Sequence, residues 1–443
     1  MAAASAPAAH GLRSLAGPAR PAPSRAQLQW QRDELALFLH FGVNTFTDRE
    51  WGDGREDPAM FAPARLDAGQ WARTARAAGF RAMILTAKHH DGFCLWPTKT
   101  TDHSVARSPF RAGGGDVVRE LVDACRAERL KTGVYLSPWD RHEPSYGDSP
   151  RYNDLYCAQL TELLTRYGDI HEVWFDGANG EGPNGRRQTY DWPRVWSLVR
   201  KLQPNAVMFS DAGPDVRWIG NERGSAGDPN WSTVAAAAVP YPGASGGAVT
   251  AMLQHGDPNG DAWRPGESDV SIRPGWFHHP GEDARVKSVD ALVDLYFTSV
   301  GRNSKLLLNV PPTRDGVLHD VDVARLAGMH ERLAAMLRAD LAAGRRVAWR
   351  RAGERRAVAE LDLGRTADVG IVDLREDIAR GQVVARYVVE GSDGSAWRVL
   401  ARGTTIGHRK LDRVGAARVR RIRVTIEDAI ATPRPLTIRI FGA

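Results

Sequence analysis

Between about Ala36 and about Leu337, short apolar runs alternate with longer amphipathic stretches, and this alternation restricts the fold more than any other feature. The amphipathic stretches carry apolar residues at the three- and four-residue spacing that predicts helices. Strands that alternate with helices of this length form βαβ units and a parallel sheet. The strand-like runs are ALFLHFG, RAMILTA, KTGVYLS, HEVWFDG, AVMFSD, DVSIRPG and KLLLNV.

Seven such runs, with a weaker one between about Val216 and Gly220, favour a (β/α)8-like TIM barrel over a doubly wound open sheet. We expect this catalytic barrel over residues 31–340, after a disordered or extended lead-in over residues 1–30. The Gly- and Pro-rich stretch from about Ala212 to Pro265 is typical of long loops at the barrel rim. Over residues 341–443, short alternating runs split by Gly, Asp and Pro predict an antiparallel β-sandwich.

The composition excludes several other classes of protein. Of the 443 residues, 42% are hydrophobic and 25% are charged, and no stretch approaches the roughly 20 apolar residues of a membrane span. The net charge is +6, but the arginines are scattered, which does not indicate a nucleic-acid partner. Three cysteines without a CxxC pair indicate neither a disulfide framework nor a zinc site. The first 25 residues lack the apolar segment of an intact signal and allow either a lead-in left after its removal or a cytoplasmic start, of which we favour the first, with a periplasmic or secreted location.

Polar and aromatic side chains gather where the expected strands end, which is the face where such barrels place their active sites. They include histidines, carboxylates and several of the 14 tryptophans, whose flat rings suit the apolar faces of sugars. This combination favours a carbohydrate substrate. The residues are His40, Glu50, Trp51, His89, His90, Tyr135, Trp139, Asp140, Asp176, Trp218, Glu222 and Trp276.

Asp176 is the sharpest candidate for chemistry. It follows the bulky run HEVWF and precedes Gly177, which lets the backbone turn and a ligand approach closely. A retaining glycosidase needs such a carboxylate as nucleophile, and a second one roughly 5–5.5 Å away to protonate the leaving oxygen. The alternative is an aspartate that caps a helix or turn. For the second carboxylate Glu222 leads, and the other candidates are Glu267, Glu181, Asp140 and Asp228.

The adjacent His89 and His90 allow two functional interpretations, which are binding of a metal ion and recognition of sugar hydroxyls. Neighbours on a strand point to opposite faces, so the pair is poorly arranged to share a metal. His40 and His142 could add ligands, but no tight set with carboxylates is evident. We therefore expect sugar recognition, and neither a metal nor an organic cofactor.

At these residues the sequence resembles the α-L-fucosidases of glycoside hydrolase family 29. The most specific blocks are HFGVNTFTDREWGDG, LTAKHHDGFCLWPTKTTDHSV and EVWFDGANG. Further blocks are VYLSPWDRH, WIGNERG, ESDVSIRPGWFHH and KLLLNVPPTRDG, so the resemblance spans nearly the whole barrel region. NERG, SPWDRH and SIRPGWF are similar to the subfamily that cleaves α1,3- and α1,4-linked fucose from branched glycans.

The resemblance implies a role for each matched residue. Asp176 would be the nucleophile, and Glu222, in the position of the subfamily's glutamate, would be the acid/base. Trp276 would wall the apolar C5-methyl side of fucose. The fucose hydroxyls would be bound by His40, Glu50, Trp51, His89 and His90, with Tyr135, Trp139 and His142 as further pocket or subsite residues.

The implied function is hydrolysis of terminal α-1,3/1,4-linked L-fucose from oligosaccharides or glycoconjugates by double displacement. Ionised Asp176 would attack the anomeric carbon while protonated Glu222 donates to the leaving oxygen, and Glu222 would then activate water. The charge of Asp176 should raise the pKa of Glu222. The alternatives are a metal-dependent barrel hydrolase, a glycosidase for another deoxy or galacto-configured sugar, and a non-catalytic fucose-binding protein.

Overall fold

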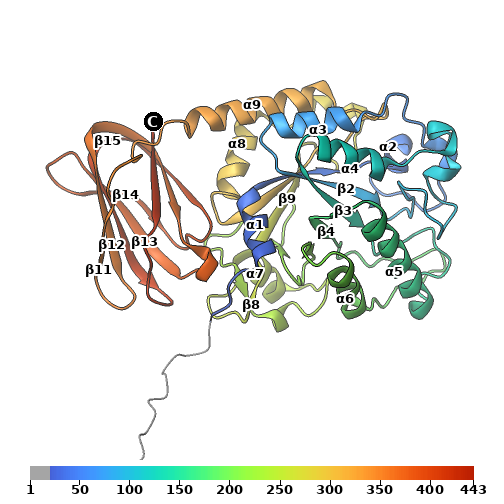
Figure 1. Cartoon of the computed structure of the whole chain (residues 1–443), viewed down its shortest axis with the longest axis horizontal. Helices are drawn as coiled ribbons and strands as arrows, with labels where there is room; N and C mark the ends of the chain where they lie inside the picture. The colour runs from blue at the N-terminus through green and yellow to red at the C-terminus, as the bar shows by residue number, and fades with distance from the viewer. Residues whose placement is uncertain (1–19) are drawn as a thin grey trace, which may run out of the picture.

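The computed structural model describes residues 20–443 and confirms a closed parallel barrel followed by a C-terminal antiparallel sheet (Figure 1). The eight barrel strands lie in the order β5-β4-β3-β2-β1-β10-β9-β6, and a parallel bridge between Phe209 and Val216 links β5 to β6. This closure excludes the doubly wound sheet. The strands are β1 (Leu35–Leu39), β2 (Ala82–Lys88), β3 (Lys131–Leu136), β4 (Glu172–Trp174), β5 (Val207–Phe209), β6 (Arg217–Trp218), β9 (Gly266–Ser271) and β10 (Ser304–Asn309).

The helices expected from the apolar spacing are present and cover the outside of the barrel (Figure 1). In α4, for example, the side chain of Asp116 caps the first turn, and one face buries Val118, Leu121 and Cys125 against the strands. The helices are α1 (Arg25–Asp33), α2 (Val43–Thr47), α3 (Ala68–Ala77), α4 (Val117–Ala127), α5 (Ser149–Arg166), α6 (Trp192–Leu202), α7 (Gly247–His255), α8 (Val289–Thr298) and α9 (Asp320–Met336).

Two segments differ from the sequence-based expectation. Helix α1 occupies residues 25–33, where a lead-in over residues 1–30 was expected, and Ser24 and Gln27 form a capping box at its start. The indole N–H of Trp30 in this helix donates to Glu172 at 2.9 Å, which ties α1 to the barrel. Residues 1–19, which carry the rest of the lead-in and the expectation about a signal, lie outside the described residues.

The stretch interpreted as rim loops also contains regular structure. It holds α7 and a two-stranded sheet of β7 (Thr233–Val234) and β8 (Ala262–Trp263). Strand β9 begins at Gly266 rather than at Asp269, because the polar Glu267 and Ser268 are buried within it. Because these two buried residues are polar, a search for apolar runs does not detect the start of this strand.

The C-terminal domain is one six-stranded antiparallel sheet that folds around a single apolar core. Register shifts after Asp362 and after Val369 bend the long strands β12 and β15. Residues 357–375, where Gly and Asp were expected to split short runs, thus form a single strand. The strands are β11 (Ala348–Arg351), β12 (Ala357–Arg375), β13 (Val384–Ser392), β14 (Arg398–Gly403), β15 (Lys410–Ala429) and β16 (Thr437–Gly442).

This domain packs directly on the barrel. Ile371, Leu411 and Phe441 belong to the apolar cluster of the barrel rather than to that of their own sheet. Around them, Arg409 donates to Glu34 at 2.8 Å and Lys410 donates to Asp228 at 2.6 Å. The C-terminal sheet therefore covers one flank of the barrel and leaves the pocket to the barrel strands.

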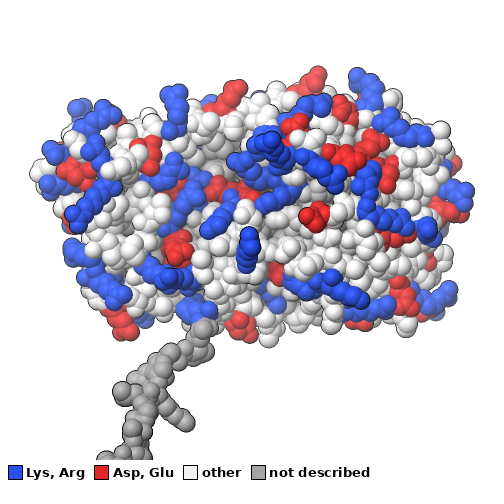
Figure 2. All heavy atoms as spheres, viewed as in Figure 1, with Lys and Arg blue, Asp and Glu red and all other residues white. Residues whose placement is uncertain are grey.

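Charged side chains of both signs share the surface. On the face drawn in Figure 2, basic side chains are interspersed with acidic ones. None of the helices within residues 20–443 is both long and apolar enough to cross a membrane. Cys94, Cys125 and Cys157 are buried free thiols.

Candidate active site

A pocket of about 450 Å³ opens at the carboxyl ends of the barrel strands. His40 follows β1, His89 follows β2 and Asp176 follows β4 at this face. The pocket collects most of the site residues expected from the sequence. It is lined by Phe38, His40, Glu50, Trp51, His89, His90, Tyr135, Trp174, Asp176, Ala178, Glu222, Asp269 and Trp276.

Asp176 is held at the tip of β4 by two hydrogen bonds. Its Oδ1 accepts the main-chain N–H of Ala178 at 2.7 Å, and its Oδ2 accepts the hydroxyl of Tyr135 at 3.1 Å. His90 lies on the same side, with its Nε2 at 4.0 Å from Oδ2. The hydrogen bond from Ala178 is the contact expected of an aspartate that only caps a turn. The other oxygen, Oδ2, nevertheless remains directed at the pocket.

A neighbouring loop leaves no room for a side chain at Gly177. A Cβ on Gly177 would lie 2.4 Å from Asp211 Oδ2 and 2.7 Å from the main-chain nitrogen of Gly243. Asp211 in turn accepts the N–H of Gly243 at 2.8 Å, which fastens this loop beside Asp176. Burial raises the pKa of Asp211 to about 6. The sequence suggested that a ligand approaches this glycine, whereas the neighbour found here is another loop of the protein.

Glu222 lies in the loop after β6 and lines the same pocket as Asp176. Partial burial raises its pKa, and the negative charges of Asp176 and Glu50 add to this, whereas a hydrogen bond from the Trp276 side chain opposes it. A raised pKa is what a carboxyl group needs to act as a proton donor near neutral pH.

The other carboxylates considered for the second position are engaged elsewhere. Glu267 lies inside the barrel, where it accepts the indole N–H of Trp174 at 3.0 Å. Asp140 pairs with Lys88 at 2.8 Å, and Asp228 pairs with Lys410. Glu267, Asp140, Asp228 and the exposed Glu181 do not line the pocket, so Glu222 is the one candidate of the five that shares it with Asp176.

His89 and His90 both line the pocket, with ring centroids 4.1 Å apart. The expectation that neighbours point to opposite faces fails because β2 ends at Lys88, after a register shift against β3, and the chain turns at Gly92 with φ +83. Burial lowers the pKa of each histidine, so both rings are neutral and can bind sugar hydroxyls.

His40 is oriented by Asn309. The Asn309 side-chain N–H group donates to the carbonyl oxygen of Trp276 at 2.8 Å, so its Oδ1 faces His40 Nδ1, also at 2.8 Å. His40 therefore carries its proton on Nδ1 and presents an unprotonated Nε2. Burial lowers the pKa of His40 to about 3, which keeps the ring neutral.

Trp139 and His142, expected as further pocket or subsite residues, do not line the pocket. Trp139 packs against the ring of His90 at 4.9 Å between centroids. His142 stacks on His103 at 4.1 Å, and its Nδ1 contacts the carbonyl oxygen of Gly54 at 2.7 Å. Both side chains build the loops behind the pocket wall.

Four lining residues were missed by the sequence-based analysis, namely Phe38, Trp174, Ala178 and Asp269. Phe38 and Trp174 stand two residues before His40 and Asp176, and side chains two apart share a face of a strand. Asp269 stands two residues after Glu267 in the same way. The alternation of side chains along a strand could therefore have identified Phe38, Trp174 and Asp269 as lining residues.

Within residues 20–443, no group of three or more His, Cys, Asp or Glu side chains is arranged to hold a metal ion. The histidines and carboxylates that line the pocket are side chains of the kinds that can bind sugar hydroxyls.

A known protein family matches most of the barrel. The family model described as α-L-fucosidase matches residues 48–335, which is more than half of the chain. The chain belongs to the α-L-fucosidases of glycoside hydrolase family 29. This fucosidase is 41% identical to α-L-fucosidase 1 of Arabidopsis thaliana over 446 residues, which cover 94% of this chain and 86% of that one.

Two solved structures are similar to the fucosidase over nearly its whole length. A glycoside hydrolase 29 family member from an unknown rumen bacterium is 40% identical, with a TM-score of 0.87 and coverage of 96% of this chain and 78% of that one. A Ruminococcus gnavus family 29 fucosidase, solved in complex with fucose, is 31% identical, with a TM-score of 0.87 and coverage of 97% of both chains. The fucosidase is thus a glycoside hydrolase that acts on a fucose-containing substrate.

Proposed function

We propose that the protein is a retaining exo-α-L-fucosidase in which Asp176 is the nucleophile and Glu222 is the acid/base. The observation that carries the proposal is that these two carboxyl groups line one pocket of about 450 Å³, together with three histidines and Trp276. This volume suits one monosaccharide with room for its leaving group, which supports removal of a terminal sugar.

Asp176 meets the requirements of a nucleophile. Tyr135 and Ala178 hold the carboxylate in one orientation, so attack at the anomeric carbon needs little rearrangement. Neutral rings of His40, His89 and His90 grip the hydroxyls, and the Trp276 ring provides the apolar wall for the C5-methyl side.

Glu222 serves both steps of the reaction. In the first step, its proton passes to the leaving oxygen as the bond from Asp176 to the anomeric carbon forms. In the second step, ionised Glu222 takes a proton from water, and the water oxygen displaces Asp176. Fucose leaves with its configuration retained, and both carboxyl groups return to their starting states.

We further propose that the natural bond is an α1,3 or α1,4 linkage. The support is the sequence around Glu222, since WIGNERG and SPWDRH resemble the subfamily with that specificity. An aromatic side chain also stands at the pocket mouth, because Trp51 is 59% exposed while it lines the pocket. A flat exposed ring beside the leaving group suits a branched glycan.

The test uses an aryl α-L-fucoside together with α1,2-, α1,3-, α1,4- and α1,6-fucosylated oligosaccharides. We expect D176A and E222A each to lose most turnover. With azide, E222A should form the α-fucosyl azide, because azide replaces water in the second step, and D176A should form the β-anomer. Normal hydrolysis of trisaccharides by E222A would refute the acid assignment, and preferential cleavage of α1,2 or α1,6 bonds would refute the linkage.

A further inference from the structure

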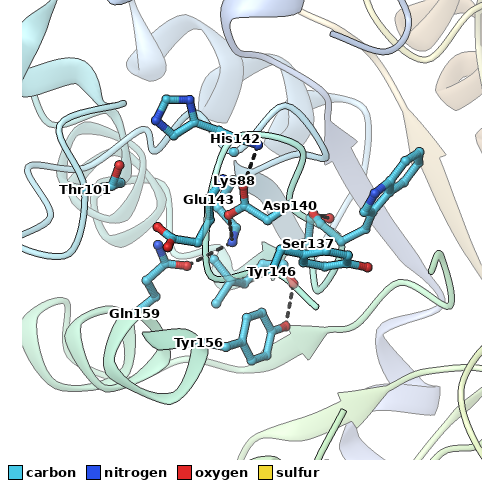
Figure 3. A network of polar contacts seen from close by, with 12 residues as sticks. Lys88, Thr101, Ser137, Asp140, His142, Glu143, Tyr146, Tyr156 and Gln159 are labelled. Atoms are coloured by element: carbon cyan, nitrogen blue, oxygen red, sulfur yellow. Dashed lines mark hydrogen bonds and ion pairs between the residues drawn. The ribbon is translucent and has the colours of Figure 1, made fainter. Parts of the chain in front are cut away.

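A fully buried ion pair lies behind the wall of the pocket, and the double-displacement chemistry does not use it. Lys88 is the last residue of β2, and its Nζ donates to Asp140 Oδ2 at 2.8 Å and to Gln159 Oε1 at 2.9 Å (Figure 3). The Lys88 side chain is 0% exposed and that of Asp140 is 3% exposed. Neither residue lines the pocket.

Asp140 fastens the loop that follows β3. Its Oδ1 accepts the main-chain N–H groups of His142 at 3.0 Å and Glu143 at 2.9 Å, while its Oδ2 accepts a hydrogen bond from Lys88 Nζ (Figure 3). Burial alone would raise the pKa of Asp140, but the charge and hydrogen bond of Lys88 lower it overall. The carboxylate is therefore charged, and it holds the loop 137–143 against β2.

The same loop carries Ser137, which contacts the pocket residue His90 but does not line the pocket itself. The Ser137 hydroxyl donates to the carbonyl oxygen of Trp139 at 2.7 Å, and its Oγ lies 2.7 Å from His90 Nδ1. A serine has one hydroxyl proton, so Oγ must accept from His90 Nδ1. Neutral His90 therefore carries its proton on Nδ1, and its free Nε2 faces Asp176 Oδ2 at 4.0 Å.

Main-chain hydrogen bonds join the loop after β2 to the loop after β3 on either side of the Ser137–His90 contact. The N–H of Ser137 donates to the carbonyl oxygen of Lys88 at 2.9 Å, and the N–H of Arg141 donates to that of His90 at 2.9 Å. The Lys88 side chain also contacts the hydroxyl of Tyr152 at 3.4 Å, and that hydroxyl donates to Pro138 in the same loop at 2.8 Å. Lys88 thus holds this loop through Asp140 and through Tyr152.

We propose that Lys88 and Asp140 are positioning residues that hold Ser137 against His90, so that neutral His90 offers Nε2 to a sugar hydroxyl beside Asp176. The proposal rests on the proposed function, because that function makes His90 a substrate contact. A purely structural role is the alternative. However, a buried ion pair stabilises a fold little compared with apolar side chains of the same volume, so stability alone does not account for it.

The first test reads the ring proton of His90 without any turnover. In protein with 15N-labelled histidine, the wild type should show the Nδ1-protonated tautomer of His90, and both K88M and S137A should show a mixture of tautomers. S137A is nearly isosteric and keeps the test valid if K88M does not fold. The control is K131M, which breaks the Lys131–Asp33 pair at the opposite end of the barrel, and it should leave the His90 signal unchanged.

The second test uses kinetics on an aryl α-L-fucoside. K88M should lower kcat/KM on the order of 100-fold, as small misplacements of a binding group do, while K131M should keep the wild-type value. In the S137A background, K88M should lower it by less than about threefold, because both changes break one chain of contacts. Full additivity of the two losses, or an unchanged His90 tautomer in K88M, overturns the proposal. Loss of the proposed function would instead appear as wild-type activity in D176A.

Discussion

The carboxylate of Glu50 holds the backbone of Trp276, since its Oε2 accepts the Trp276 main-chain N–H at 2.8 Å. Its other oxygen, Oε1, accepts the N–H of Phe277 at 3.1 Å and contacts His279 Nε2 at 2.6 Å. Burial disfavours the charged form of His279, but hydrogen bonds to Asp48 and Glu50 raise its pKa overall. Glu50 therefore places the aromatic wall of the pocket as well as lining it.

We expect E50Q to weaken substrate binding more than it weakens the fold. Glutamine has one acceptor oxygen in place of two, so one of the N–H donors of this segment faces an amide NH2 group. The KM for an aryl α-L-fucoside should rise and kcat/KM should fall about tenfold, with a smaller loss in Tm. D48N is the control, because Asp48 contacts only the far side of His279. A wild-type KM in E50Q would contradict this arrangement.

The pKa of Glu222 should depend on the charge of Asp176. D176N removes a neighbouring negative charge that raises the pKa of Glu222, so that pKa should fall, while burial continues to raise it. A 13C NMR titration of labelled glutamate side chains measures this shift, and D154N, at an exposed pair with Arg194, is the control. An unchanged titration in D176N would mean that the two groups do not sense each other.

The same shift sets the sign of the pH dependence of turnover. Glu222 must be protonated to donate to the leaving oxygen, so kcat/KM for a natural trisaccharide should fall as pH rises through its pKa. An aryl fucoside with a good leaving group needs no proton, and its rate through the first step should not show that loss. If activity on the two substrates declined equally at high pH, Glu222 would not be the acid.

Much of this site could be predicted from the sequence because barrels place chemistry at strand ends. Asp176, His40 and His89 were identified from their positions alone, and the structure brings them to one pocket. Trp139 and His142 follow β3 in the same way, yet they support the wall, since the loop turns them away from the pocket. Position after a strand does not report the direction of a loop side chain.

Other features depend on interactions that a single sequence does not display. The register shift before Lys88 lets His89 and His90 share one pocket, against the ordinary alternation of a strand. Helix α1 was missed because its buried face includes the polar Gln27 and Gln31 beside Trp30, which weakens the apolar signal. In both places, contacts with distant parts of the chain override the pattern expected from neighbouring residues alone.

We expect G177A to disturb catalysis through the loop that packs beside Asp176. The added Cβ would lie 2.4 Å from Asp211 Oδ2 and 2.7 Å from the Gly243 nitrogen, so either that loop or the Asp176 turn must move. A displacement of the nucleophile by about 1 Å should lower kcat/KM on the order of 100-fold. G247A is the control, since nothing lies within 4 Å of its added Cβ. Wild-type kinetics in G177A would show that the approach is not constraining.

Glu34 should make the contact between the two domains sensitive to acid. Burial alone would raise the pKa of Glu34, but the hydrogen bond to His408 and the charges of Arg409 and Arg375 lower it from 4.5 to about 2. Its side chain is only 17% exposed, so this depression corresponds to about 3 kcal/mol of folding stability. That stability is present above about pH 4.5 and is lost as pH falls towards the folded pKa.

E34Q therefore has a defined pH signature. At pH 7 its free energy of unfolding in urea should be about 3 kcal/mol below that of the wild type, and the difference should shrink steadily between pH 4.5 and pH 3. E331Q, at an exposed position of α9, should match the wild type throughout. A difference for E34Q that stays constant down to pH 3 would mean that packing at residue 34, rather than its charge, holds the C-terminal sheet on the barrel.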